Sequence, residues 1–168
     1  MTPRLATARL ALVAAAACIA TQYATGAHAG TAELEPTNGS NVKGEVTFSQ
    51  DGPHVRATGE ITGLTPGPHG LHLHEKGDCS APDASSAGGH YNPAGTRHGG
   101  PASAEHHAGD FGNVVANRSG TATVDSTLTG VSLASLTGKG LVVHAQPDDE
   151  KTDPAGNSGA RIACGVVK

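Results

Sequence analysis

The sequence has no run of lysines or arginines, no CxxC motif, and only one long apolar segment, which lies at its N-terminus. The lack of a basic cluster argues against a nucleic-acid partner. The lack of a second long apolar segment predicts no transmembrane helix in the rest of the chain. Without CxxC spacing, a thiolate metal site is disfavoured. Aromatic residues are also scarce, at 2% of the chain, so the ten histidines are the ring-bearing side chains whose placement needs an explanation.

The N-terminal apolar segment has the layout of a secretory signal peptide over residues 1–29. A basic start at Arg4 and Arg9 precedes the apolar run Leu10–Ala20, and Ala27-His28-Ala29 supplies small residues before the expected cleavage point. A membrane-spanning helix needs roughly 20 apolar residues, and this run is shorter. We therefore expect an exported protein that reaches the periplasm, the cell surface or the extracellular space.

The mature chain, residues 30–168, is long enough for one domain with a single buried core. Two of the 11 basic residues and none of the 15 acidic ones lie in the signal, so the mature net charge is −6. Cys18 would allow lipid attachment, although the alanines before it lack the expected leucine, and a free or a lipid-anchored form both stay open. Cys79 and Cys164 remain as an even pair in an exported chain, which predicts one disulfide.

Short runs with the pattern of β-strands follow one another along the mature chain. No stretch keeps an apolar period of 3.6 residues, so little helix is expected, and the pattern predicts an all-β sandwich or barrel. Two long polar segments, Glu75–Gly109 and Ala145–Ala160, interrupt the series and are expected to be functional loops. The runs are GEVTFSQ (44–50), HVRATGEI (54–61), GLHLHE (70–75), GNVVANR (112–118), TATVDSTL (121–128), GLVVHAQ (140–146) and RIACGVV (161–167).

Seven of the ten histidines lie in or beside these two loops. His72 and His74 are two residues apart in a strand-like run, so both rings would project from one face of a sheet. Taken alone, the pair could equally be two exposed surface histidines. The other five are spread along the chain rather than contiguous, which indicates ligands that a fold brings together; they are His90, His98, His106, His107 and His144.

The types of side chain suggest two metal sites. His72, His74 and His144 lie on strand-like segments, and an all-imidazole set is typical of copper. The loop histidines His90 and His98, with a third from the adjacent His106 and His107 and with Asp110, would form a closed tetrahedral set of the kind that zinc takes. Spacing alone does not decide between His106 and His107.

Several motifs in order resemble the copper,zinc superoxide dismutase family. The resemblance extends from about Ala32 to Lys168, and the secretion signal and the long insert between Cys79 and His90 are similar to the exported bacterial branch of that family. The motifs that carry it are GLHLHEKGDC, GGHYNPAGTRHGGP, HHAGDFGN, LVVHAQPDD and GNSGARIACGVV.

The resemblance implies an eight-stranded antiparallel Greek-key β-barrel or sandwich with one copper and one zinc ion per subunit. It implies an enzyme that converts superoxide to dioxygen and hydrogen peroxide through alternating Cu(II) and Cu(I). The family pattern His-x-Gly-Asp selects His107 over His106. The implied roles are copper binding by His72, His74, His90 and His144; zinc binding by His90, His98, His107 and Asp110; a catalytic proton on the bridging His90; anion orientation by the catalytic Arg161; a carboxylate link between the two sites at Asp148; and a Cys79–Cys164 disulfide.

Other interpretations of the same residues stay open at this point. The alternative function is a non-catalytic exported copper- and zinc-binding protein on the same fold. His69 lies on the opposite strand face from His72 by parity and is predicted to be a structural histidine. The segment from His144 to Arg161 is shorter than in eukaryotic family members, so their charged steering cluster is incomplete, and Lys151 is a candidate helper. A homodimer is left open.

Overall fold

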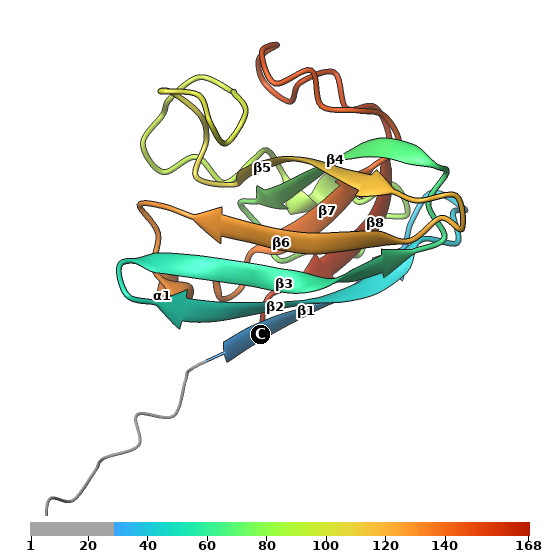
Figure 1. Ribbon diagram of the computed structural model, residues 1–168, viewed down its shortest axis with the longest axis horizontal. Helices are drawn as coiled ribbons and strands as arrows, with labels where there is room; N and C mark the ends of the chain where they lie inside the picture. Colours follow the sequence, from blue (N-terminus) through green and yellow to red (C-terminus); the bar gives the residue numbers. More distant parts are fainter. Residues whose placement is uncertain (1–28) are drawn as a thin grey trace, which may run out of the picture.

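The computed structural model describes residues 29–168, and the expected signal peptide, with Cys18, therefore lies outside the described residues except for Ala29. The described part contains eight β-strands and two very short helices, which agrees with the predicted all-β class (Figure 1). The strands are β1 (Ala29–Pro36), β2 (Lys43–Asp51), β3 (His54–Thr62), β4 (Gly67–His74), β5 (Asp110–Ala116), β6 (Ala122–Leu128), β7 (Gly140–His144) and β8 (Arg161–Val166), and the helices are η1 (Ser85–Ala87) and α1 (Leu133–Leu136).

All strand pairs are antiparallel, and the strands lie in the order β5-β4-β7-β8-β1-β2-β3-β6. The two edge strands, β5 and β6, also contact each other, so the sheet curls into a nearly closed barrel. Neighbours such as β4 and β7, or β3 and β6, are far apart in sequence, which is the Greek-key connection. The predicted architecture is confirmed.

The alternation of β4 creates both the core and the site. Leu71 and Leu73 are fully buried in the hydrophobic core of the barrel. His72 and His74 must point to the opposite side of the strand, yet they are equally buried. The second face of β4 is therefore covered, and the residues that cover it come from the long loops.

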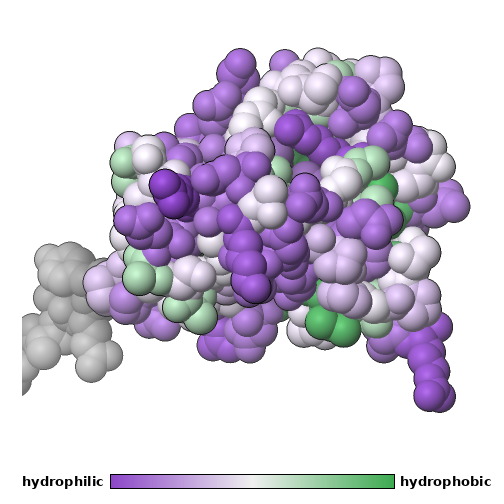
Figure 2. Space-filling model, turned by 90° about the horizontal axis from the view of Figure 1, so that it is seen from above, coloured by the Kyte–Doolittle hydropathy of each residue, from purple (hydrophilic) through white to green (hydrophobic). Residues whose placement is uncertain are grey.

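Both long loops lie on one side of the barrel (Figure 1), where the predicted Glu75–Gly109 and Ala145–Ala160 segments connect β4 to β5 and β7 to β8. The loops meet, because the side chain of Glu150 in the second loop lies against Gly100 of the first and Gly112 of β5. Viewed from above in Figure 2, the surface is largely hydrophilic, and its hydrophobic residues form small separate patches. Among residues 29–168 no helix has the length and apolar character to cross a membrane.

Candidate metal centre

Two groups of buried side chains converge where the loops cover β4 and β7. In each group, the candidate ligand atoms all lie within 4.8 Å of one another, and residues 29–168 contain no third group of this kind. His90 belongs to both groups. The first group is His72, His74, His90 and His144, and the second is His90, His98, His107 and Asp110.

The first group is built from rigid strands with one loop residue. His72 and His74 come from β4, His144 ends the neighbouring β7, and His90 joins them through a single β-bridge to His74. The rings of His72 and His90 are 4.0 Å apart between centroids, and those of His72 and His144 are 4.9 Å apart. Three of the four imidazoles are therefore placed by strands, and only His90 depends on the position of a loop.

One nitrogen of each ring in this group is occupied and the other is free. Nε2 of His72 lies 2.8 Å from Asp148 Oδ2, Nδ1 of His74 lies 2.9 Å from the Gly88 carbonyl, and Nδ1 of His144 lies 3.3 Å from the Gly159 carbonyl. Since these partners accept hydrogen bonds, the occupied nitrogens carry the proton and the opposite ones present lone pairs. Buried polar atoms without a partner are rare in proteins. Here four of them face a common point: Nδ1 of His72 and Nε2 of His74, His90 and His144.

Burial keeps these imidazoles neutral. It lowers the pKa of His72 to about 4, although the hydrogen bond with Asp148 opposes the shift. Burial likewise lowers the pKa of His74 to about 2 and that of His144 to about 3. At neutral pH no proton competes for the free lone pairs. A set of neutral nitrogen donors suits copper, so the residues fit that ion.

The second group has the dimensions of a tetrahedral zinc site. Zinc–nitrogen bonds of 2.0–2.1 Å require donor atoms about 3.3 Å apart at the corners of a tetrahedron. Nδ1 of His107 lies 3.3 Å from both His90 Nδ1 and Asp110 Oδ1, and His90 Nδ1 lies 2.8 Å from Asp110 Oδ1. Nδ1 of His98, buried and without a hydrogen bond, lies 3.1 Å from the other oxygen of Asp110. Three imidazoles and one carboxylate fit a zinc ion.

Asp110 stays ionised in this group. Its burial would raise the pKa, but hydrogen bonds with His90 and with the backbone N–H of His107, together with the nearby rings, lower the pKa to about 2. His90 turns Nδ1 toward this carboxylate and leaves Nε2 for the first group. One ring therefore presents a donor to each group, as a bridging ligand must.

Asp148 connects the two groups from behind. Its Oδ2 lies 2.8 Å from His72 Nε2 and its Oδ1 lies 2.9 Å from His98 Nε2. The backbone N–H of Asp148 donates to Asn113 Oδ1 at 2.7 Å, and Asn113 Nδ2 donates back to the Asp148 carbonyl at 2.9 Å. Gly156 has a φ of +59°, and a Cβ there would lie 1.8 Å from Asp148 Oδ1, so this position requires glycine.

Arg161, at the start of β8, is tied to the first long loop. Its Nη1 donates to the Ala84 carbonyl and its Nη2 to the Gly88 carbonyl, each at 2.7 Å. The Gly88 carbonyl also accepts from His74 Nδ1, so Arg161 and His74 share one acceptor. The guanidinium is half-buried and is held beside the first group in a fixed orientation.

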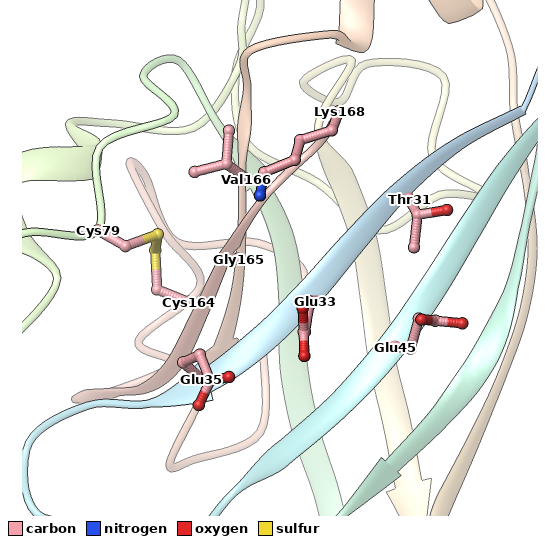
Figure 3. Close-up of a pocket in the computed structure, with 9 residues that line it drawn as sticks. All are labelled: Thr31, Glu33, Glu35, Glu45, Cys79, Cys164, Gly165, Val166 and Lys168. Atoms are coloured by element: carbon pink, nitrogen blue, oxygen red, sulfur yellow. A yellow bond between two sulfur atoms is a disulfide. The ribbon is translucent and has the colours of Figure 1, made fainter.

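Cys79 and Cys164 form a disulfide, as predicted, and their Cα atoms are 5.8 Å apart. The bond joins the same loop to β8, close to the segment that holds Arg161 in place. It also lines a surface pocket whose other wall carries Glu33, Glu35 and Glu45 (Figure 3). No histidine lines this pocket, so it is separate from the two metal-binding groups.

Comparison with known proteins decides the family. Residues 42–167 match the profile of the copper/zinc superoxide dismutases. The chain belongs to the copper/zinc superoxide dismutase family. As a member, it is an enzyme that acts on superoxide and carries one copper and one zinc ion per subunit.

Two curated relatives and one solved structure show the extent of the similarity. An extracellular copper–zinc superoxide dismutase of Brugia pahangi is 43% identical over 148 residues, which covers 81% of this chain and 73% of the relative. Copper–zinc superoxide dismutase 2 of Mesembryanthemum crystallinum is 45% identical over 138 residues, which covers 76% and 88%. A crystal structure of the clock protein EA4 aligns with a TM-score of 0.76 at 37% identity, over 84% of this chain and 94% of that one.

The structure brings together the residues that the dismutase resemblance singles out and leaves the others apart. His106 is outside both groups, and its Nδ1 contacts the carbonyl of His107. His69 is buried, with its two ring nitrogens at the carbonyls of His144 and Thr65, as a structural histidine should be. Sequence reasoning missed Asn113, whose side chain holds the backbone of Asp148, and Gly88, whose carbonyl accepts from Arg161. It also missed Gly156, which leaves room for Asp148 Oδ1. The residue types alone do not indicate these partners.

Proposed function

We propose that this superoxide dismutase binds copper through His72, His74, His90 and His144 and zinc through His90, His98, His107 and Asp110. One observation carries the proposal: in the two groups, five buried ring nitrogens have no hydrogen-bond partner. In each of these five rings, the opposite nitrogen is hydrogen-bonded. Such an arrangement costs free energy in an empty protein, because each polar atom is removed from water without compensation. A metal ion at each group removes that cost.

Copper held by these four histidines would supply the one-electron redox chemistry by which one superoxide is oxidised and a second is reduced. The balanced reaction consumes two superoxide ions and two protons and gives one dioxygen and one hydrogen peroxide. His90 supplies one of the protons: its Nε2 holds a proton in one half of the cycle and releases it to the reduced oxygen species in the other. Its Nδ1 stays on the side of Asp110, so the ring keeps its position throughout.

Arg161 attracts and orients the anionic substrate. Two of its five N–H groups are engaged by the Ala84 and Gly88 carbonyls, which leaves others free to donate to superoxide. The guanidinium keeps its charge although burial lowers its pKa, because arginine does not deprotonate in proteins. Lys151 is exposed in the second long loop and is the other candidate for steering the anion.

Asp148 orients His72 and His98 through hydrogen bonds to their outer nitrogens. Acceptors at this position fix the ring tautomer and make the inner nitrogen a better donor. Because one carboxylate serves both rings, it couples the geometry of the copper group to that of the zinc group. Asn113 holds this segment in place through two hydrogen bonds between its side-chain amide and the backbone of Asp148.

The protein is exported, an assignment that the disulfide and the extracellular relative support. We extend the proposal to a signal peptide at residues 1–29 and a dismutase domain at residues 30–168, in the exported bacterial branch of the family. The first strand, β1, begins at Ala29, next to the expected cleavage point. A homodimer is part of the proposal, and sedimentation of the mature protein measures it.

Metal analysis of the purified mature protein, coupled to a superoxide-consumption assay, tests the function. We expect one copper and one zinc per chain and rapid loss of superoxide. Stoichiometric metal without catalysis would instead identify a non-catalytic metal-binding protein. Substitution of His74 by Ala should remove copper while the zinc group, which does not include this residue, keeps its ion.

A further inference from the structure

The guanidinium of Arg161 donates its hydrogen bonds to uncharged groups. Both terminal nitrogens donate to backbone carbonyls, and within residues 29–168 no carboxylate lies within 4.0 Å of the guanidinium. A charge in this state acts on its surroundings through its field, which an approaching anion feels before any contact forms. Any other fixed charge close to Arg161 therefore changes the attraction for superoxide.

Asp83 is such a charge. It directly precedes Ala84, whose carbonyl accepts the hydrogen bond from Arg161 Nη1 at 2.7 Å. The carboxylate is exposed, and its position is fixed because Oδ1 accepts from the backbone N–H of Ser85 at 3.0 Å. Hydrogen bonds with Ser85 are the main reason why the pKa of Asp83 lies below its ordinary value, and the charge of Arg161 lowers it further. In turn, Asp83 is the charged group that raises the pKa of Arg161 against the effect of burial.

We propose that Asp83 weakens the attraction of superoxide to the metal centre by opposing the field of Arg161. Superoxide and the carboxylate carry charges of the same sign, so each approach toward Arg161 includes a repulsion from Asp83. The proposal rests on the proposed function, because it concerns the substrate of that same site. Under this proposal, Asp83 lowers the rate at which superoxide reaches the metal centre without contacting a metal or the substrate.

The size of the effect follows from exposure and distance. Asp83 is in contact with water and lies more than 4.0 Å from Arg161, so its field is reduced by the solvent and by salt. Removal of the charge should therefore raise the association rate of superoxide by roughly two- to threefold at low ionic strength. The gain should shrink as salt is added, because screening acts on the same interaction.

Asp83→Asn tests the proposal, and Asp78→Asn is its matched control. Both aspartates are exposed in the same loop, and both accept from a serine N–H two residues further on, Asp78 from Ser80 at 2.9 Å. Asparagine keeps that acceptor, so both variants keep the local turn. The cation near Asp78 is Lys76 instead of Arg161.

Two measurements on the copper- and zinc-loaded proteins decide the outcome. Asp83→Asn should raise the superoxide rate roughly two- to threefold at low salt and make the rate fall more steeply as salt is added. It should also lower the Kd of azide by the same factor. Azide is a monoanion whose binding is followed by the visible absorption of Cu(II). Asp78→Asn should leave all three unchanged. Equal rates and azide affinities for Asp83→Asn and wild type, or an equal gain in Asp78→Asn, would overturn the proposal. If the wild type consumes no superoxide, the proposed function fails, and the azide titration alone still decides the role of Asp83.

Discussion

Replacement of Arg161 by alanine is the sharpest test of how the site acts on its substrate. The guanidinium is not a ligand in either metal-binding group, so both metals should stay bound. What is lost is the fixed charge beside His74 and the free N–H donors directed to the anion. We expect the superoxide rate to fall about tenfold or more.

The magnitude follows from the partial burial of Arg161. A unit charge about 6 Å away attracts an anion by roughly 0.7 kcal/mol in water and by roughly 3 kcal/mol at the effective dielectric constant of about 20 that applies near a protein surface. Arg161 lies between these limits, because half of it is covered and the rest is solvated. A loss of about 1.4 kcal/mol is within this range and corresponds to a tenfold slower reaction.

Steady consumption of superoxide, measured against ionic strength, is the assay. Arg161→Lys should give an intermediate rate, since the charge remains while the forked hydrogen-bonding geometry is lost. Added salt should slow the wild type more than Arg161→Ala, because only an attraction that exists can be screened. In Arg161→Ala, the carbonyl that His74 and Arg161 share loses one of its two donors. The Cu(II) spectrum of the variant is the control that His74 still keeps its orientation. A full rate with unchanged salt dependence in Arg161→Ala would refute the reasoning, and Lys151 would then be the next residue to substitute.

Three further predictions concern the bridge, the disulfide and acid stability. Selective removal of zinc should change the electronic spectrum of Cu(II), because His90 then loses its second bond, and an unchanged spectrum would contradict the bridge. Cys79→Ser should lower the free energy of unfolding by about 4 kcal/mol, since the disulfide closes a separation of 85 residues; the denaturation midpoints of variant and wild type should differ in oxidising buffer and converge in reducing buffer. The metal-free protein should lose stability as pH falls below 6.5. In that range, three histidines gain protons in the unfolded chain, but in the fold His72 stays neutral until about pH 4, His144 until about pH 3 and His74 until about pH 2. Each one should therefore cost about 1.4 kcal/mol of stability per pH unit. A flat stability between pH 6.5 and 4.5 would contradict their burial.

Some of the strands that the sequence predicts show a clear alternation over one buried face, whereas others, such as β7, are buried along their whole length. In β2, Val46 and Phe48 are fully buried and their neighbours are not. The eighth strand, β1, is absent from the predicted runs, although Ala32 and Leu34 point into the core. Its apolar residues are few and one is only an alanine, and the strand starts next to the expected signal cleavage point, so the local pattern is weak. Pairing with β2 and β8 makes it a strand, and pairing is a tertiary effect.

The candidate ligands could be found from sequence because their chemistry depends on residue type and spacing. Several residues that hold them in place could not, because their contribution depends on a backbone carbonyl, on the absence of a side chain, or on a partner that only the fold brings near. The carbonyl that His74 and Arg161 share belongs to Gly88, whose φ of +76° favours glycine, but the residue type does not show which donors that carbonyl meets. Asn113 is one polar residue among many on exposed strands, and only the fold shows that it grips the backbone of Asp148.

The same contacts explain why the barrel alone does not make the centre. β4 fixes His72 and His74 on its outer face. Because the leucines on one face of this strand and the histidines on the other are all buried, both faces must be covered. The barrel core covers Leu71 and Leu73, while the histidine face is covered only when the first long loop folds back and places His90 against His74. The disulfide and the two hydrogen bonds of Arg161 hold that loop on β8, on the copper side, and Asp148 holds the second loop on His72 and His98. The loops therefore supply or orient ligands of both metal-binding groups, so a substitution that frees either loop should weaken metal binding even when every ligand is intact.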